Sequence, residues 1–190
     1  MTNAQYASFL NKKGNRREGG VTWLEDDSEY VLIERRGNQF TPKSGYGDHP
    51  VIEVSWYGAK AYCKDAGKRL PTEEEWQQAC QGRDGRTYPW GNSFRSGISN
   101  ISGSDDGYDK TSPVGSFPGG ASPYGAMDMS GNVWEWTSSL YDKLYPEIGG
   151  SFFVLHGGAW SRNANHARCE YRVGDLPGPG GSSSGFRCAR

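Results

Sequence analysis

Two carboxylates with the spacing of a metal site lie in the sequence DMSGNVWE, residues 128–135. Asp128 and Glu135 stand seven positions apart, and Gly131 and Val133 between them can turn backbone carbonyl oxygens toward one point. Carboxylate and carbonyl oxygens are the hard ligands that Ca²⁺ takes in proteins. The pattern predicts a structural calcium site, and the alternative is a solvated acidic turn.

The histidines and cysteines point to no catalytic metal. His49, His156 and His166 are too scattered in the sequence for a histidine metal site, and no His or Cys cluster has zinc spacing. No serine occupies a nucleophile elbow, and no glycine-rich phosphate loop precedes a helix. The four cysteines allow three pairings if all are bridged, and buried reduced thiols are the alternative.

Residues 161–190 differ in composition from the residues before them. Lys, Gln, Glu, Met and Trp occur 33 times in residues 1–160 but only once, as Glu170, in residues 161–190. Codons for these five amino acids never end in a pyrimidine, so their absence is what mutagenesis of the adenines in AAC or AAT codons would leave. A flexible glycine-serine loop is the alternative explanation. The composition predicts a diversified segment that presents adaptable side chains on a rigid aromatic scaffold.

The elements that position these residues are short. Helical periodicity predicts helices over 2–10, 55–66 and 72–82, the last with a capping box of Thr72 and Glu75. Strand-like runs lie at 29–34, 51–54 and 152–156. From about 84 to 150, turn-forming and aromatic residues dominate, so metal ions or disulfides must order this stretch.

Length and charge exclude several classes of protein. A chain of 190 residues fits a single domain, residues 1–190. A formal net charge of −1 suggests no basic surface for nucleic acid or an anionic membrane. No apolar run approaches the roughly 18 residues of a membrane span, and the N-terminal residues lack an export signal pattern. We expect a soluble protein with no nucleic-acid partner and no membrane insertion.

Five ordered motifs resemble those of the formylglycine-generating enzyme domain, the sulfatase-modifying type of C-type lectin fold. They are HPVIEVSWYGAKAYCKDAGKRLPTEEEWQQAC (49–80), YPWGN (88–92), YGAMDMSGNVWEWTSS (124–139), GGAW (157–160) and GFRCAR (185–190). The resemblance implies an α+β, C-type lectin-like fold of the formylglycine-generating enzyme subtype, with little regular secondary structure. Domains of this kind include a copper-dependent oxidase, the lectin-like half of sulfoxide synthases, and the variable proteins of diversity-generating retroelements.

The resemblance also implies two disulfides and two calcium sites. Matching the motifs pairs Cys63 with Cys188 and Cys80 with Cys169. The first calcium site of the family matches the four positions in 128–135 given above. The second calcium site of the family matches Asn100, Ile101, Asp106 and Tyr108. Asn100 and Asp106 would offer side-chain oxygens, and the other two would offer backbone carbonyls.

The oxidase of this family holds copper through a further cysteine pair. That pair lies between its GGS-aromatic motif and its RC motif, where this chain reads SRNANHA, residues 161–167, with no thiol. Copper(I) selects soft sulfur ligands. We therefore expect no copper and no enzymatic activity.

The chain looks most like one of the retroelement variable proteins, in which diversified asparagine codons fill this same C-terminal stretch. The resemblance implies a non-catalytic protein whose C-terminal surface, about 157–187, binds a macromolecular target such as a protein or surface ligand, with diversification by a retroelement. The alternatives are an oxidase of the formylglycine-generating type, a related sulfatase-modifying enzyme or a relative that uses other chemistry, and a purely structural accessory domain. Disulfides favour an extracellular or virion-surface setting. Every residue at the candidate variable positions is of a type that can arise from an asparagine codon: Ser161, Asn163, Asn165, His166, Tyr171, Val173, Gly174, Leu176, Pro179, Gly181, Ser182 and Ser183.

Overall fold

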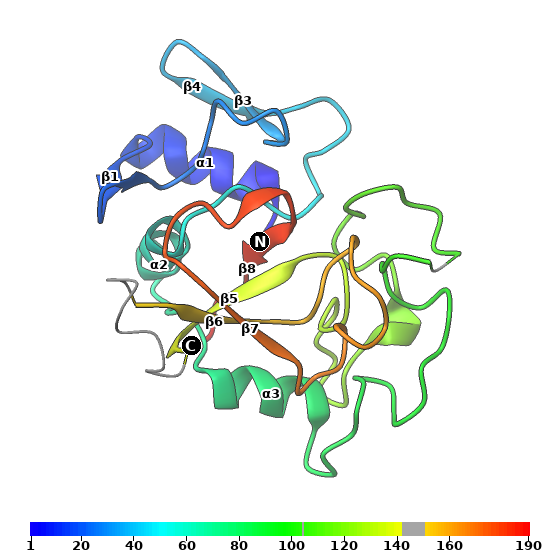
Figure 1. Ribbon diagram of the computed structural model, residues 1–190. Helices are drawn as coiled ribbons and strands as arrows, with labels where there is room; N and C mark the ends of the chain where they lie inside the picture. The colour runs from blue at the N-terminus through cyan, green and yellow to red at the C-terminus, as the bar shows by residue number, and fades with distance from the viewer. Residues whose placement is uncertain (104, 142–150) are drawn as a thin grey trace.

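The computed structural model describes residues 1–103, 105–141 and 151–190 (Figure 1). Its α-helices are α1 (Asn3–Lys13), α2 (Trp56–Asp65) and α3 (Glu73–Gln81), with short 3-10 turns η1 (Pro118–Gly120) and η3 (Gly181–Ser183). Its strands are β1 (Arg17–Glu18), β2 (Val21–Thr22), β3 (Ile33–Arg36), β4 (Gln39–Pro42), β5 (Trp134–Leu140), β6 (Phe153–His156), β7 (Arg172–Asp175) and β8 (Ser184–Phe186).

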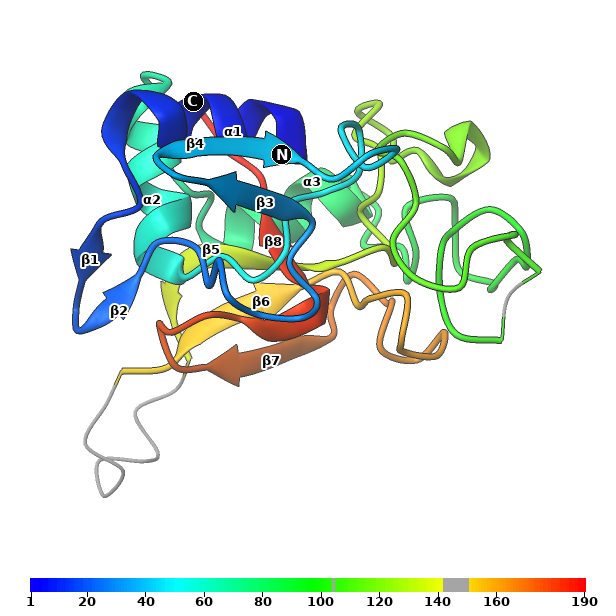
Figure 2. The ribbon, with the colours of Figure 1, turned by 90° about the horizontal axis from the view of Figure 1, so that it is seen from above.

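The largest sheet in the described part of the chain has four strands in the order β7-β6-β5-β8. Strand β5 pairs antiparallel with β6 and parallel with β8, and β6 pairs antiparallel with β7. Strand β7 is therefore an edge strand, which Figure 2 shows at the border of the sheet. This order brings the C-terminal strands β7 and β8 to opposite sides of the β5–β6 pair.

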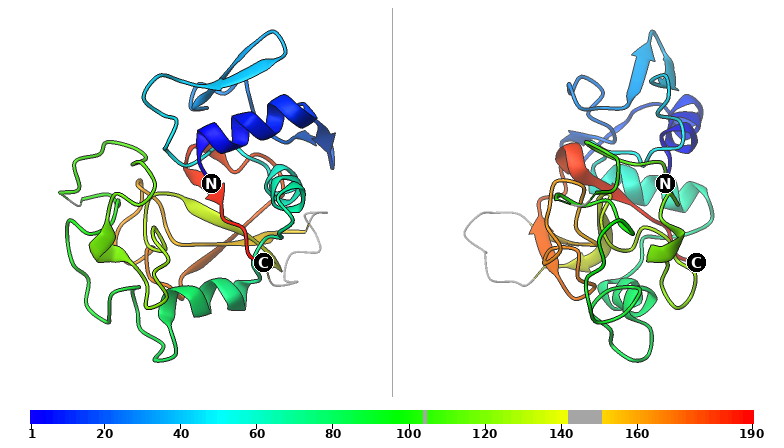
Figure 3. Two further views of the ribbon diagram at one scale, coloured as in Figure 1. Left: turned by 180° about the vertical axis from the view of Figure 1, so that it is seen from behind. Right: turned by 90° about the vertical axis from the view of Figure 1, so that its right-hand side faces the viewer.

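Helices flank the sheet on both sides. In Figure 3, α1 lies on one side of the sheet and α3 on the other. Helix α1 packs against β4, and α3 packs against β5 and β6. A continuous aromatic core fills the space on the α1 side and reaches from Tyr6 in α1 through Trp136 in β5 to Phe186 in β8. Aromatic side chains bury large areas each, so few regular elements are needed to form this core.

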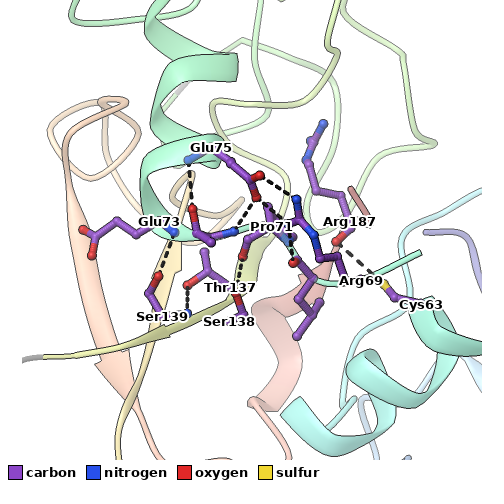
Figure 4. Close-up of polar contacts among 11 residues, drawn as sticks. Cys63, Arg69, Pro71, Glu73, Glu75, Thr137, Ser138, Ser139 and Arg187 are labelled. Atoms are coloured by element: carbon purple, nitrogen blue, oxygen red, sulfur yellow. Dashed lines mark hydrogen bonds and ion pairs between the residues drawn. The ribbon is translucent and has the colours of Figure 1, made fainter. Parts of the chain in front are cut away.

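The start of α3 is fixed by its cap and by β5 (Figure 4). Thr72 Oγ1 accepts from the Glu75 amide at 3.2 Å, and the Thr72 amide donates to the Glu75 carboxylate at 2.9 Å, so the predicted capping box is confirmed. Arg69 donates to both oxygens of Glu75 at 2.5 and 2.6 Å. The bond from Arg69 holds the pKa of Glu75 down at about 2. The Glu73 amide donates to Ser139 Oγ of β5 at 2.9 Å, which ties the helix to the sheet.

Between α3 and the sheet lies a buried histidine. His156 of β6 is fully buried, and its ring stacks on the indole of Trp76 with centroids 4.8 Å apart. Its Nε2 lies 3.4 Å from a carboxylate oxygen of Glu73, and neither ring nitrogen makes a well-formed hydrogen bond within the described residues. Arg172 also donates to Glu73, at 3.1 Å. Burial lowers the pKa of His156, although Glu73 opposes the shift.

The three predicted helices are confirmed within a few residues, and so is the strand at 152–156. The strand expected at 29–34 begins later, at Ile33, and pairs with β4 in a hairpin. The strand expected at 51–54 is wrong. Glu53 has a positive φ of 58°, which interrupts the extended backbone, and the amides of the segment donate to separate partners: Val51 to Met1 O, Glu53 to Gly181 O, and neighbouring Ser55 to Trp23 O. Because each partner belongs to a different segment, no ladder forms.

Two disulfides link the helices to the C-terminal segment. Cys63 of α2 bonds to Cys188, and Cys80 of α3 bonds to Cys169, with Cα–Cα distances of 5.6 and 5.7 Å. These are the pairs that the family resemblance implied. The turn-rich stretch after α3 is ordered in part by Asn132, which exchanges two hydrogen bonds of 3.1 Å with the backbone of Ser112.

Within the described residues, no helix combines the length and the apolar character that a membrane span requires.

Candidate ligand-binding site

A pocket of about 410 Å³ opens beside the edge strand β7, and we call it the C-terminal pocket. Most of its wall comes from the segment between residues 162 and 184, and the rest from β5 and β6. Its lining residues are Trp134, Leu155, Arg162, His166, Tyr171, Val173, Gly174, Asp175, Gly180, Ser183 and Ser184. The fold therefore brings together residues that lie far apart in the C-terminal segment.

Three neighbouring rings shape one wall of the C-terminal pocket. The rings of His166 and Tyr171 meet edge to face with centroids 4.8 Å apart, and Tyr171 lies 6.1 Å from Trp134. Asn163 Oδ1 contacts His166 Nδ1 at 2.8 Å and also accepts from the Asn165 amide at 3.1 Å. Asn163 thus orients His166 without lining the pocket itself.

Two charged residues of the C-terminal pocket were missed by the sequence analysis. Arg162 is exposed at the rim, and Asp175 lies half-buried at the end of β7. Burial raises the pKa of the Asp175 carboxyl. Both lie inside the predicted region 157–187, and Asp is itself reachable from an asparagine codon, so a wider reading of the codon pattern would have included Asp175. A ligand meets a cation, a carboxyl group, hydroxyls and aromatic rings within one pocket.

Two glycines of the C-terminal pocket are held by close packing. A Cβ on Gly174 would lie 2.5 Å from the ring of Tyr141, and a Cβ on Gly180 would lie 2.4 Å from the Cβ of Ser184. Only glycine fits at these positions without movement of the neighbour. Gly174 was a candidate variable position, and this contact limits what can replace it.

The remaining candidate positions lie around the pocket instead of lining it. Ser161 and Leu176 are exposed. Pro179 and Gly181 anchor the segment, through a bridge to Ser55 and a hydrogen bond of 3.2 Å from the Glu53 amide. The carbonyl of Ser182 accepts from the Trp160 indole at 3.3 Å.

The first calcium set is occupied by a guanidinium. Arg187 donates to both oxygens of the buried Glu135 carboxylate, one of them at 2.7 Å, and Trp76 Nε1 donates to it at 2.6 Å. Arg187 also donates to the Asp128 carbonyl at 3.2 Å. Arg187 thus neutralises the carboxylate of Glu135. The set of Asp128, Gly131, Val133 and Glu135 does not fit a calcium ion while Arg187 is bound to Glu135.

In the second calcium set, the carboxylate of Asp106 contacts two of the other residues. Asp106 accepts from the amides of Ile101 at 3.1 Å and Tyr108 at 3.0 Å. Asn100 is buried, and its Nδ2 donates to the Lys110 carbonyl at 2.8 Å. Their side-chain and backbone carbonyl oxygens are ligands of the kind that Ca²⁺ takes, so the chemistry of this set fits Ca²⁺. No group of three or more His, Cys, Asp or Glu side chains in the described ranges could hold a metal ion.

The four-stranded sheet, its flanking helices and the turn-rich region define an α+β, C-type lectin-like fold of the formylglycine-generating enzyme subtype. Residues 1–190 match the family model described as the sulfatase-modifying factor enzyme 1-like domain. The chain belongs to this family.

Similar proteins in this family include both active and inactive forms by name. The inactive C-alpha-formylglycine-generating enzyme 2 of Bos taurus is 42% identical over 95% of this chain and 62% of its own length. The formylglycine-generating enzyme of Mus musculus is 37% identical over 90% of this chain and 49% of its own. Hercynine oxygenase of Mycolicibacterium thermoresistibile is 33% identical over 93% of this chain and 46% of its own. The chain spans between 32% and 62% of the length of the first curated relatives it matches.

These relatives correct the expectation that the protein is not an enzyme. That expectation was wrong because it rested on the missing cysteine pair of one reaction, whereas the similar chains include enzymes with different names and different reactions. All four cysteines of this chain are in disulfides.

A solved structure shares the fold at low sequence identity. Variable protein 1 of Treponema denticola superposes with a TM-score of 0.66 at 23% identity, covering 78% of this chain and 74% of its own.

Proposed function

We propose that the protein binds a macromolecular ligand, most simply a polypeptide, in the C-terminal pocket. The observation that carries this proposal is the meeting of five candidate variable residues in one pocket: His166, Tyr171, Val173, Gly174 and Ser183. A pocket with aromatic walls and a few polar groups is the usual form of a recognition site. Tyr171 supplies the aromatic anchor, since aromatic residues dominate binding energy at such sites.

Binding can be tested with peptides of random sequence. A random peptide library is selected on the wild-type protein, and the selected peptides are then measured against the double variant His166→Ala/Tyr171→Ala and against the control Ser161→Ala, which changes an exposed residue outside the pocket. We expect affinity to fall about tenfold or more in the double variant, because it removes two packed rings, and to stay unchanged in the control. Equal affinity for all three proteins would contradict the proposal.

Diversification of this segment by a retroelement is part of the same proposal. It is supported by the composition of residues 161–190 and by the exposed or half-exposed placement of the candidate positions. Many copies of the gene from one source population are sequenced over codons 157–187. Substitutions confined to adenines of an invariant template copy, beside a reverse transcriptase, are the expected result. A uniform segment without a template would contradict diversification and leave the binding proposal to the peptide experiment.

A second candidate function is modification of a bound polypeptide, in the manner of the family's oxidase. It is favoured by the 37% identity with the mouse formylglycine-generating enzyme. The test is incubation of a sulfatase-motif peptide with the protein, with and without copper, followed by mass spectrometry. Conversion of the peptide cysteine would establish this activity, and an unchanged peptide mass would reject it. Two disulfides support an oxidising setting for either function.

A further inference from the structure

A second concave surface, which shares no lining residue with the C-terminal pocket, lies where α1 and α2 meet the β1–β2 hairpin. It is a groove of about 590 Å³, and we call it the basic groove. Figures 1 and 2 show these elements together at one corner of the molecule. The groove includes basic side chains from three of its walls: Lys13, Arg16, Lys60 and Lys64.

Most of the positive charge in the basic groove is not neutralised. Lys13 pairs with Asp65 at 2.8 Å, and Glu18 accepts from the Trp23 indole at 3.4 Å. Arg16, Lys60 and Lys64 have no carboxylate partner within the described ranges. The chain's formal net charge of −1 hides this local excess. Exposed charges of one sign in a concave surface raise the local concentration of oppositely charged ligands.

Aromatic rings form the floor of the basic groove. Phe9 and Trp23 are stacked there with centroids 5.3 Å apart, and half-buried Tyr57 packs so closely on the hairpin that a Cβ on Gly19 would lie 2.3 Å from its ring. The Arg16 guanidinium lies over Trp23, with 5.6 Å between its Cζ and the ring centroid. These contacts hold the hairpin against α2 and keep the groove open.

We propose that the basic groove binds an acidic segment of a partner polypeptide. Discrete carboxylates of a peptide can lie opposite Arg16, Lys60 and Lys64 and avoid the acidic side chains of Glu18 and Asp65. A continuous row of phosphates, as in a nucleic acid, would meet those two carboxylates as well. A membrane surface is flat and would not enter a concave site. The half-buried Tyr57 ring in the groove lining offers an apolar surface for one side chain of the peptide.

The probe is a fluorescein-labelled peptide in which glutamate alternates with glycine and a tyrosine stands at one end, and its binding is measured by fluorescence anisotropy. We expect saturable binding at low ionic strength that weakens as salt is added, because exposed ion pairs are screened. The triple variant Arg16→Gln/Lys60→Gln/Lys64→Gln should weaken binding by about tenfold or more, since three ion pairs are lost. The control Arg83→Gln/Arg95→Gln/Lys110→Gln removes the same charge from residues outside the groove and should bind as the wild type does.

Lys60 also lies over the Trp56 ring at 4.7 Å, so its replacement can affect packing. The single variant Lys64→Gln leaves this contact and the Arg16–Trp23 contact intact, and it should still weaken binding about two- to threefold with an unchanged melting temperature. Three results would overturn the proposal: no binding of the acidic peptide, equal weakening in the control variant, or tighter binding of a single-stranded oligonucleotide or of phosphatidylserine vesicles than of the peptide.

Discussion

Gly174 illustrates how a single residue limits the C-terminal pocket. Its backbone contacts the ring of Tyr141, which itself lies under the guanidinium of Arg172 with 4.9 Å between that group and the ring centroid. A larger residue at this position must displace an aromatic ring that is already held by a cation. Variation at Gly174 is therefore more costly than variation at the exposed candidates such as Ser161.

We predict that Gly174→Ala lowers the free energy of unfolding by about 1–3 kcal/mol, the usual cost of overpacking. Gly178→Ala is the matched control, because a Cβ there would lie 4.0 Å from its nearest neighbour, Val21. Urea denaturation followed by tryptophan fluorescence measures both. A stable Gly174→Ala protein would show that Tyr141 moves freely, and Gly174 would then be open to diversification.

The residues of the C-terminal pocket were only partly predictable from sequence. His166 and Tyr171 were found because the codon pattern marks their positions. Trp134, Arg162 and Asp175 were not among the candidate positions. The bond between Glu135 and Arg187 joins positions far apart in the chain, and sequence patterns of local spacing do not reveal such pairs. The calcium prediction at Glu135 failed to account for this partner.

At the scale of elements, the contact between α3 and β6 contains the buried His156. The unfolded chain binds a proton on this histidine near its ordinary pKa of 6.5, whereas burial lowers the pKa in the folded protein. The unfolded state therefore takes up the proton first as pH falls. The cost of burying a charge therefore favours the neutral ring in the folded protein.

We predict that the contribution of His156 to the free energy of unfolding is constant above pH 6.5. Below pH 6.5 the free energy of unfolding falls as the pH approaches the lowered pKa of His156 in the folded protein. The slope from one proton cannot exceed about 1.4 kcal/mol per pH unit. Urea denaturation at a series of pH values, compared between wild type and His156→Phe, isolates this contribution. An identical slope in the variant would show that His156 does not cause it.

The turn containing Asn100, Ile101, Asp106 and Tyr108 is a second element with a testable property. We predict that Ca²⁺ raises the melting temperature of the wild-type protein and that a chelator reverses the increase, with about 2.7 kcal/mol gained at a hundredfold excess over Kd. Asp106→Asn should abolish the response, and Asp128→Asn should retain it because Arg187 occupies that set. No response in the wild type, with no calcium by elemental analysis, would remove calcium from both sets.

Elements with local signals were predictable, and elements defined by distant partners were not. The capping box at Thr72 and Glu75 located α3 because a cap is formed by neighbouring residues. Strand β5 was missed because WEWTSSL alternates weakly, and β8 was missed because SGF resembles a loop in composition. Both become strands by pairing with each other. The segment 51–54 was predicted as a strand but is not one. Its apolar side chains are buried, and its backbone bonds to several separate segments.

At the scale of the whole molecule, we propose that residues 1–190 form one domain. The same core cluster contains Tyr6 of α1 and Phe186 of β8. We predict a single cooperative unfolding transition, with far-ultraviolet circular dichroism and tryptophan fluorescence changing together. Two separated transitions would show that the α1 region and the sheet unfold independently.

The disulfides should contribute similar amounts to stability. Their residue separations of 125 and 89 differ little on a logarithmic scale, so removing either pair should cost about 2–4 kcal/mol. The variants are Cys63→Ala/Cys188→Ala and Cys80→Ala/Cys169→Ala, compared by urea denaturation. Only the variant Cys80→Ala/Cys169→Ala should also weaken the binding of library-selected peptides to the C-terminal pocket, because Cys169 is close in sequence to Tyr171 and β7. Equal loss of binding in both variants would contradict this distinction.

The two disulfides are nested, since the pair at 80 and 169 lies inside the pair at 63 and 188. A protease that cuts once anywhere between residues 80 and 169 leaves two pieces that are still joined by both bonds. The turn-rich surface after α3 can therefore be nicked without releasing a fragment. A nicked molecule would keep the wall of the C-terminal pocket attached to α2 and α3, and it would separate into two bands on a denaturing gel only after reduction.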